Sequence, residues 1–142
     1  MNVRLNVRLM LFGMASATIV AAQPSHAVLT NLDTAQWIHE KGGPPESESV
    51  MLREDPQSGG MELLVRFPGG HVIKPHWHES NERIVVLEGQ LTLHQDARDT
   101  ALNLGGYAYL PAREVQRLSC SSKTRCTFYL AWDGPPASHA PK

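Results

Sequence analysis

Short alternations of apolar and polar residues, separated by turns, are the main pattern in this chain. Between Met61 and Phe67 every second residue is apolar, which is the period of a strand with one buried face. Further strands are expected at Val50–Arg53, Ile84–Leu87, Leu91–Leu93, Tyr107–Leu110, Leu118 and Phe128–Trp132, with a polar loop at Gln95–Thr100. Turn residues return about every 8–12 positions, and no amphipathic helix lies between them. The pattern predicts an all-β fold, an antiparallel sandwich or barrel.

The composition fits one such domain and excludes some function classes. The chain has 142 residues, of which 42% are hydrophobic and 19% charged, and its 11 Gly and 10 Pro fit many turns. Lys and Arg total 13 against 14 Asp and Glu, which gives a formal net charge of −1. Because no basic stripe is present, binding to nucleic acid is not expected.

The first 27 residues have the pattern of a secretory signal peptide. Arg4 and Arg8 precede a mostly apolar, uncharged stretch, Leu9–Ala22, and Ser25-His26-Ala27 follows as a small-x-small site. Cleavage is expected after Ala27 or after Ala22. The apolar stretch is shorter than the about 20 residues that span a bilayer, so no stable membrane anchor is expected. The sequence therefore predicts a periplasmic or secreted protein.

The rest of the chain divides into three parts. Residues 28–49 are expected to be an extended lead-in, because Gly42-Gly43-Pro44-Pro45 excludes regular structure in its middle. Trp37 in this lead-in is expected to pack on the outside of the domain. Residues 50–132 are expected to form the β domain, and residues 133–142 a flexible tail that has no core to join.

Cys120 and Cys126 flank a polar segment between two expected strands. If that segment is a hairpin loop, the two cysteines face each other across the strands, and an oxidising compartment permits a disulfide. Two free thiols at a strand end are the alternative. Two cysteines are too few for a disulfide scaffold or for a zinc site of four thiolates.

The strongest chemical signal lies between Gly70 and Gly89. His76-Trp77-His78 places two imidazoles on the same side of an extended segment, and it directs Trp77 to the other side, towards outer packing. A tight turn at residues 79–81 would bring Glu82 back beside the histidines. Two neutral imidazoles and one carboxylate form a mixed nitrogen and oxygen site, which suits Fe(II), Mn(II), Ni(II) or Zn(II) without distinguishing among them.

The spacing Gly70-x5-His76-x-His78-x3-Glu82-x6-Gly89 resembles the first signature motif of the cupin superfamily. Gly105-x5-Pro111 resembles the start of the second motif, and the segment between the motifs has the short length of compact single-domain bacterial cupins. The Arg-Phe-Pro-Gly-Gly and Pro-His-Trp-His strings look like those of small exported cupins. The resemblance covers Val50 to Trp132. It implies a single jelly-roll-like antiparallel β-barrel with a metal inside, held by ligands from adjacent strands. Cupins include enzymes, sugar-binding modules and storage proteins, so the fold alone does not give the function.

After Pro111 the chain departs from the second cupin motif. The family has glycine and then histidine where this chain has Arg113 and Gln116. Arg113 predicts a turn that avoids positive φ, which glycine tolerates at little cost. Gln116 stands at the fourth ligand position, where its amide oxygen either binds the ion directly or hydrogen-bonds a metal-bound water. The expected metal set is His76, His78, Glu82 and Gln116, and a metal-free barrel whose polar residues bind a ligand is the alternative.

Other chemistry-bearing side chains are expected to have structural roles. His71 is expected in a solvated loop and His94 at an exposed strand end, while Tyr107, Tyr109 and Phe128 are expected in the core or at its rim. No general base beyond the expected ligands can be named.

Two function classes therefore stay open. One is a metal-dependent enzyme that acts on a small oxygenated substrate. The other is a non-catalytic cupin that binds a sugar or small acid, with or without metal. In both cases the expected partner is a small molecule, and the sequence leaves a homodimer open.

Overall fold

The computed structural model describes residues 26–39, 47–95 and 97–142. The predicted signal peptide, apart from its last two residues, lies outside these ranges, as does Gly42–Pro45. Within the described ranges the chain forms strands and no helix, which confirms the all-β prediction, and no described segment is a helix able to cross a membrane. The strands are β1 (Ile38–His39), β2 (Glu48–Glu54), β3 (Met61–Pro68), β4 (Trp77–His78), β5 (Glu82–Glu88), β6 (Leu91–Gln95), β7 (Arg98–Leu102), β8 (Tyr107–Leu110), β9 (Arg117–Cys120), β10 (Arg125–Trp132) and β11 (Ser138–His139).

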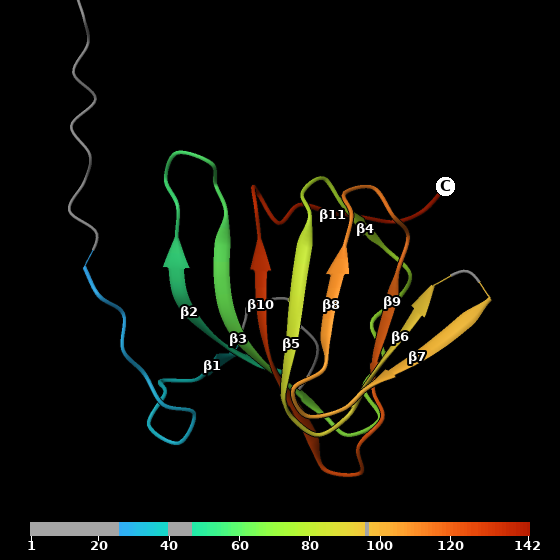
Figure 1. Cartoon of the computed structure of the whole chain (residues 1–142), viewed down its shortest axis with the longest axis horizontal. Helices are drawn as coiled ribbons and strands as arrows, with labels where there is room; N and C mark the ends of the chain where they lie inside the picture. The colour runs from blue at the N-terminus through green and yellow to red at the C-terminus, as the bar shows by residue number, and fades with distance from the viewer. Residues whose placement is uncertain (1–25, 40–46, 96) are drawn as a thin grey trace, which may run out of the picture.

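The strands form two main antiparallel sheets (Figure 1). The large sheet has the order β1-β2-β3-β10-β5-β8, and the small sheet has the order β7-β6-β9. A short ribbon of β11 and β4 completes the arrangement. β10, which is near the C-terminal end, lies between β3 and β5 in the middle of the large sheet. This non-sequential order is the jelly-roll-like topology that the sequence predicts.

The core combines inward-facing side chains of both sheets. In β3 the alternation seen in the sequence directs Leu63, Val65 and Phe67 inward, where each is at least nine-tenths buried. Phe128 of β10 and Leu91 of β6 are almost fully buried in the same cluster. Burial of side chains of this size stabilises the fold by about 1.5–3 kcal/mol each. One continuous core therefore holds both sheets, as expected for a single domain.

A disulfide joins Cys120 of β9 to Cys126 of β10, with a Cα–Cα distance of 5.7 Å. The predicted pairing is present, but the predicted hairpin is wrong. β9 belongs to the small sheet and β10 to the large one, so the bond connects two sheets and not two strands of one hairpin. Both cysteines are buried.

Two boundaries differ from the predicted ones. The segment expected as a loop at Gln95–Thr100 contains the end of β6 and most of β7, whose residues are largely exposed. An exposed strand at a sheet edge needs no apolar alternation, so the sequence carries no signal for it. The first strand of the barrel begins at Glu48, two residues earlier than predicted. Trp37 does pack on the outside of the domain, with the Arg66 guanidinium 3.6 Å above its ring.

The C-terminal segment folds back on the domain and does not form a free tail. β11 pairs with β4, with Ser138 opposite His78 and His139 opposite Trp77. The indole of Trp77 and the ring of His139 stack with their centroids 4.2 Å apart. The Ser80 hydroxyl also donates to the Pro135 carbonyl at 3.0 Å. The expectation that residues 133–142 have no core to join is therefore wrong through His139, because backbone pairing and ring stacking hold them.

Arg113 has a φ of 68°, although the sequence predicts a turn that avoids positive φ. The prediction is wrong because the turn is held by hydrogen bonds: the Arg113 N–H donates to the His78 carbonyl at 2.8 Å, and the Glu114 N–H donates to the Pro111 carbonyl at 3.3 Å. A left-handed conformation at a residue with a Cβ costs about 1–2 kcal/mol. The chain therefore keeps the glycine-type turn of the family without the glycine.

Four of the remaining side chains differ from expectation. His71 is half-buried and packs on Phe67, with ring centroids 4.8 Å apart. His94 is not free in solvent, because its ring lies between Asp99 and the Ser119 hydroxyl. Tyr107 and Tyr109 are exposed on β8 and are not core residues. Phe128, in contrast, is in the core as predicted.

Candidate metal centre

His76, His78 and Glu82 converge at one end of the space between the sheets. One ligand atom of each lies within 4.8 Å of the others, and no other such group of three is found among the described residues. His78 Nε2 is 3.4 Å from Glu82 Oε2. His78 comes from β4 and Glu82 from the first position of β5, so the turn between them brings the carboxylate back beside the imidazole, as the sequence predicts.

Both imidazoles are oriented by backbone carbonyls. His76 Nδ1 lies 2.8 Å from the Lys74 carbonyl oxygen, and His78 Nδ1 lies 3.2 Å from the carbonyl oxygens of Pro136 and Ala137. A carbonyl oxygen only accepts hydrogen bonds, so Nδ1 carries the proton in each ring and Nε2 carries the lone pair. This is the orientation in which metal-binding histidines are commonly held.

Burial shifts the proton affinities of this group. Glu82 is only 5% exposed, and burial raises its pKa to about 7, against a smaller opposing effect of the hydrogen bond from Gln116. Burial also lowers the pKa of His78, and the neighbouring His76 adds to this effect. Both pKa shifts favour the uncharged form of the side chain, as expected in a poorly solvated site.

Gln116 lies at the same end of the cavity. Its backbone exchanges two hydrogen bonds with that of His76, at 2.9 and 2.8 Å, so the two residues are direct neighbours. Its side-chain Nε2 donates to the Glu82 carboxylate. Its Oε1 is buried and has no hydrogen-bond partner among the described residues. The structure thus brings all four expected site residues together, with Gln116 in direct contact with two of the other three, His76 and Glu82.

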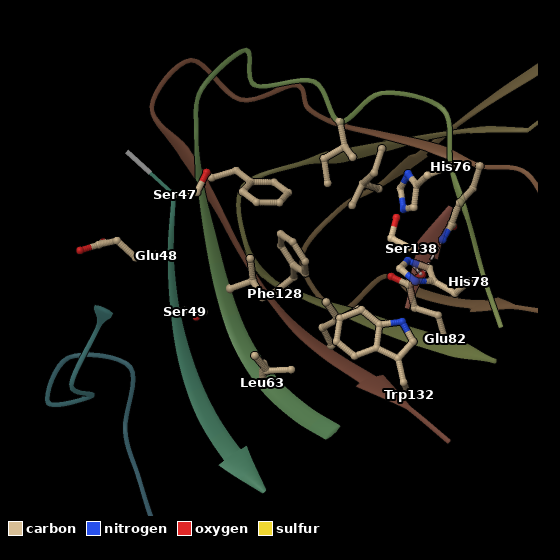
Figure 2. Close-up of a pocket in the computed structure, with 16 residues that line it drawn as sticks. Ser47, Glu48, Ser49, Leu63, His76, His78, Glu82, Phe128, Trp132 and Ser138 are labelled. Atoms are coloured by element: carbon tan, nitrogen blue, oxygen red, sulfur yellow. Dashed lines mark hydrogen bonds and ion pairs between the residues drawn. The ribbon is translucent and has the colours of Figure 1, made fainter. Parts of the chain in front are cut away.

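A cavity of about 450 Å³ opens from this group (Figure 2). Most of its lining is apolar, and we call these residues the apolar wall: Leu63, Val65, Phe67, Ile73, Leu118, Phe128 and Leu130. Figure 2 shows Ser47 and the first two residues of β2, Glu48 and Ser49, on the side away from the histidines. Ser138 lies beside the histidines. The site is therefore a mainly apolar chamber with one polar end, the usual form of a small-molecule site.

Trp132 connects the apolar wall to the polar end. Its ring centroid is 5.4 Å from that of His78, and its Nε1 is buried with no hydrogen-bond partner among the described residues. In Figure 2 the indole nitrogen faces the side of His78 and Glu82. Nothing in the sequence marks Trp132 or Ser138 as a site residue. Both reach the site by pairing with strands more than 40 residues away, and no local signal marks such contacts.

The donor set fits a divalent transition metal. Two imidazole nitrogens with free lone pairs and a carboxylate would repel one another at these distances unless a cation or a proton lies among them. Burial adds to this cost, because it raises the pKa of Glu82 to about 7 and so disfavours the bare carboxylate. Imidazole and carboxylate ligands suit iron, manganese, nickel and zinc. His76, His78 and Glu82 would hold the ion, with the Gln116 amide beside it.

Comparison with known proteins identifies the fold independently. The family model of the ChrR cupin-like domain matches residues 25–133. A search of the curated proteins found no match.

Three solved structures show the same fold. The polyketide cyclase RemF from Streptomyces resistomycificus is 19% identical, with a TM-score of 0.65 over 82% of this chain and 87% of that one. KdgF from Halomonas sp. is 19% identical, with a TM-score of 0.59 over 72% and 92%. Rhodobacter sphaeroides ChrR, an anti-sigma factor in complex with SigE, is 17% identical, with a TM-score of 0.58 over 72% and 52%.

At these identities the solved structures are informative about the fold alone. The family match covers most of the chain, including all four expected site residues. Together with the jelly-roll-like sheets and the convergent His76, His78 and Glu82, it shows that this chain belongs to the family of ChrR cupin-like domains, within the cupin superfamily.

Proposed function

We propose that this protein is an exported, metal-dependent cupin enzyme that acts on a small oxygenated molecule. One observation carries the proposal: both histidines give their Nδ1 proton to backbone carbonyls and present Nε2 beside the Glu82 carboxylate at the end of a cavity. Two histidines and one carboxylate are the ligand set of non-haem iron oxygenases, which keep coordination positions open.

His76, His78 and Glu82 would hold a divalent ion, and that ion would supply polarisation of a substrate oxygen or reactivity with O2. The protein's own residues have three roles. His76, His78 and Glu82 fix the position of the ion, and Gln116 donates to the Glu82 carboxylate and so keeps it oriented. The apolar wall excludes water and holds the body of the substrate.

A non-catalytic binding protein is the second candidate, and one observation favours it. Beyond the expected ligands, the only carboxylate that lines the described cavity is Glu48, which lies on the side away from the histidines. Its carboxylate is 3.9 Å from the Arg66 guanidinium. No described residue is therefore placed as a general base beside the ion.

Export is part of the proposal, supported by the pattern of residues 1–27 and by the disulfide. N-terminal sequencing of protein from a secreting host should begin at Gln23 or Val28, and recovery of intact Met1 in the cytoplasm would contradict export. Sigma-factor binding, which is known for ChrR, is not included, because export separates a protein from the compartment in which sigma factors act.

Metal analysis of protein purified from the exported fraction is the first test. We expect close to one divalent ion per chain, and we expect the His76→Ala/His78→Ala variant to lose it while staying folded, because the core does not depend on the site. His94→Ala is the matched control, since this histidine bonds Asp99 and Ser119 and does not line the cavity. Full metal content in the double variant would place the ion elsewhere.

Oxygen uptake by the iron-loaded protein, measured against a panel of small oxygenated compounds, then separates the two candidates. Uptake that depends on one compound and disappears in the His76→Ala/His78→Ala variant supports the enzyme. Saturable binding of a compound without any conversion, with each of the four candidate metals, would favour the non-catalytic protein.

A further inference from the structure

The charge at the polar end of the cavity does not balance once the expected ion is bound. A divalent ion brings two positive charges, and metal-bound histidines are neutral. Glu82 supplies one negative charge, and Glu48, the other carboxylate that lines the cavity, is already near Arg66. One positive charge is thus left beside an apolar wall, where an unpaired charge is costly. A ligand with a single negative charge would neutralise it.

Trp132 provides a second, independent indication of the ligand's chemistry. Its Nε1–H is a donor, it is buried, and it has no acceptor among the described residues. Its ring packs near His78, so the unpaired donor lies at the same end as the unbalanced charge. Leaving a buried donor unpaired is unfavourable, and an acceptor oxygen of a ligand would satisfy it.

The remaining lining limits what the body of the ligand can be. The apolar wall itself offers no hydrogen-bonding groups, and Ser47, Glu48 and Ser49 lie on the far side of the cavity. A sugar would therefore lose the hydration of most of its hydroxyl groups against the wall without gaining partners there. A hydrocarbon or aromatic body has no hydroxyl hydration to lose, and its burial against the wall is favourable. The wall therefore selects against the sugar that the sequence analysis leaves open.

We infer that the ligand of this cavity is a small monocarboxylate with an apolar body, and that Trp132 Nε1–H donates a hydrogen bond to its carboxylate. The inference rests on the metal site of the proposed function. One carboxylate oxygen lies toward the ion and the other accepts from Trp132, while the body packs against the apolar wall. Trp132 is a specificity-determining residue in this arrangement.

Benzoate is the probe, and zinc-loaded protein labelled with nitrogen-15 is the sample. The chain has three tryptophans, and the indole signal that disappears in Trp132→Phe identifies Trp132 in the NMR spectrum. Benzoate should move the Trp132 indole signal in a saturable way. The Trp37 indole already donates to the Leu32 carbonyl and Trp77 does not line the cavity, so their signals should stay in place.

Calorimetry measures the affinity for benzoate, alongside the NMR spectra. Trp132→Phe keeps an aromatic ring but removes the donor and part of the ring surface, so we expect benzoate to bind about tenfold or more weakly, with zinc content unchanged. Trp37→Phe, the same substitution on the outside of the domain, should bind like the wild type. Benzyl alcohol and glucose, which lack the negative charge, should bind at least tenfold more weakly than benzoate.

The outcomes distinguish a failure of this inference from a failure of the metal site on which it depends. Zinc content is measured before benzoate is added, and its absence would overturn the proposed function and this inference together. Zinc binding without benzoate binding, an unmoved Trp132 signal, equal affinity in Trp132→Phe, or equal affinity for benzyl alcohol would each overturn this inference alone.

Discussion

His78 Nδ1 lies 3.2 Å from the carbonyl oxygen of Ala137, a residue 59 positions further along the chain. This contact makes the C-terminal segment part of the metal site, because the carbonyl fixes which nitrogen of His78 carries the proton. Pairing of β11 with β4 and the Trp77–His139 stack hold that carbonyl in place.

A chain that ends at Asp133 should therefore bind zinc about 10–100-fold more weakly, the usual cost of losing a group that orients a metal-binding histidine. β10 is intact in this variant, so the core should remain folded by circular dichroism. A chain that ends at Ala140 keeps β11 and is the matched control. Equal zinc affinity of all three chains in a competition titration would show that the segment does not position His78.

Gln116 should modulate the metal site without being essential to it. Gln116→His restores the family residue and should tighten zinc or nickel binding, since imidazole suits these ions better than an amide oxygen. Gln116→Leu removes the donor to Glu82 and should weaken zinc binding, but less than loss of a histidine does. Unchanged affinity in both variants, measured against a chromophoric chelator, would show that position 116 does not act on the ion.

Metal binding should depend on pH through Glu82. Its pKa in the metal-free protein is raised to about 7, and the ion requires the carboxylate to be deprotonated. Zinc affinity should therefore fall by up to about tenfold for each pH unit below 7, and binding at pH 6 should release a proton to the buffer. Calorimetry in two buffers of different ionisation enthalpy measures that proton, and its absence would contradict the raised pKa.

The same shift predicts how pH affects the stability of the metal-free protein. Between pH 4.5 and 7 the folded chain keeps a proton on Glu82 that the unfolded chain loses, so the Glu82 contribution to stability decreases as pH rises. The lowered pKa of His78 acts in the opposite direction below pH 6.5. Glu82→Gln isolates the first effect, because the variant cannot titrate at this position. In urea unfolding, the free energy of unfolding of the variant should rise relative to that of the wild type by up to about 3 kcal/mol between pH 4 and 8. A constant difference across that range would contradict it.

Arg113→Gly should stabilise the protein by about 1 kcal/mol, because glycine adopts the observed positive φ without the steric cost that Arg113 carries. The backbone hydrogen bond to His78 does not depend on the side chain and should remain. Arg113→Ala keeps the steric cost and is the matched control. Urea unfolding of the metal-free proteins gives the comparison, and equal stability of the two variants would show that the turn is not strained.

The sequence predicts the local parts of this molecule well and the long-range parts poorly. His76, His78 and Glu82 lie within seven residues, so a two-residue strand period and one turn suffice to bring them together. The alternation of Leu63, Val65 and Phe67 likewise identifies the inner face of β3.

Trp132 and Ser138 take part in the site only because β10 and β11 pair with strands far away in the chain, and no residue pattern records such a pairing. The two cysteines combine a local feature, which the sequence predicts, with a long-range one, which it does not. Their spacing predicts the bond, but the bond joins two sheets, which depends on how the whole chain is arranged.

The central position of β10 has a consequence for the order in which the protein can be made. The ribosome completes β1, β2 and β3 on one side, and β5 and β8 on the other, before it synthesises the strand that joins them. Until residues 125–132 emerge, β3 and β5 each lack a neighbour and the core lacks Phe128. The large sheet therefore closes only when nearly the whole chain has been made, through contacts between residues far apart in the sequence, and such contacts form slowly.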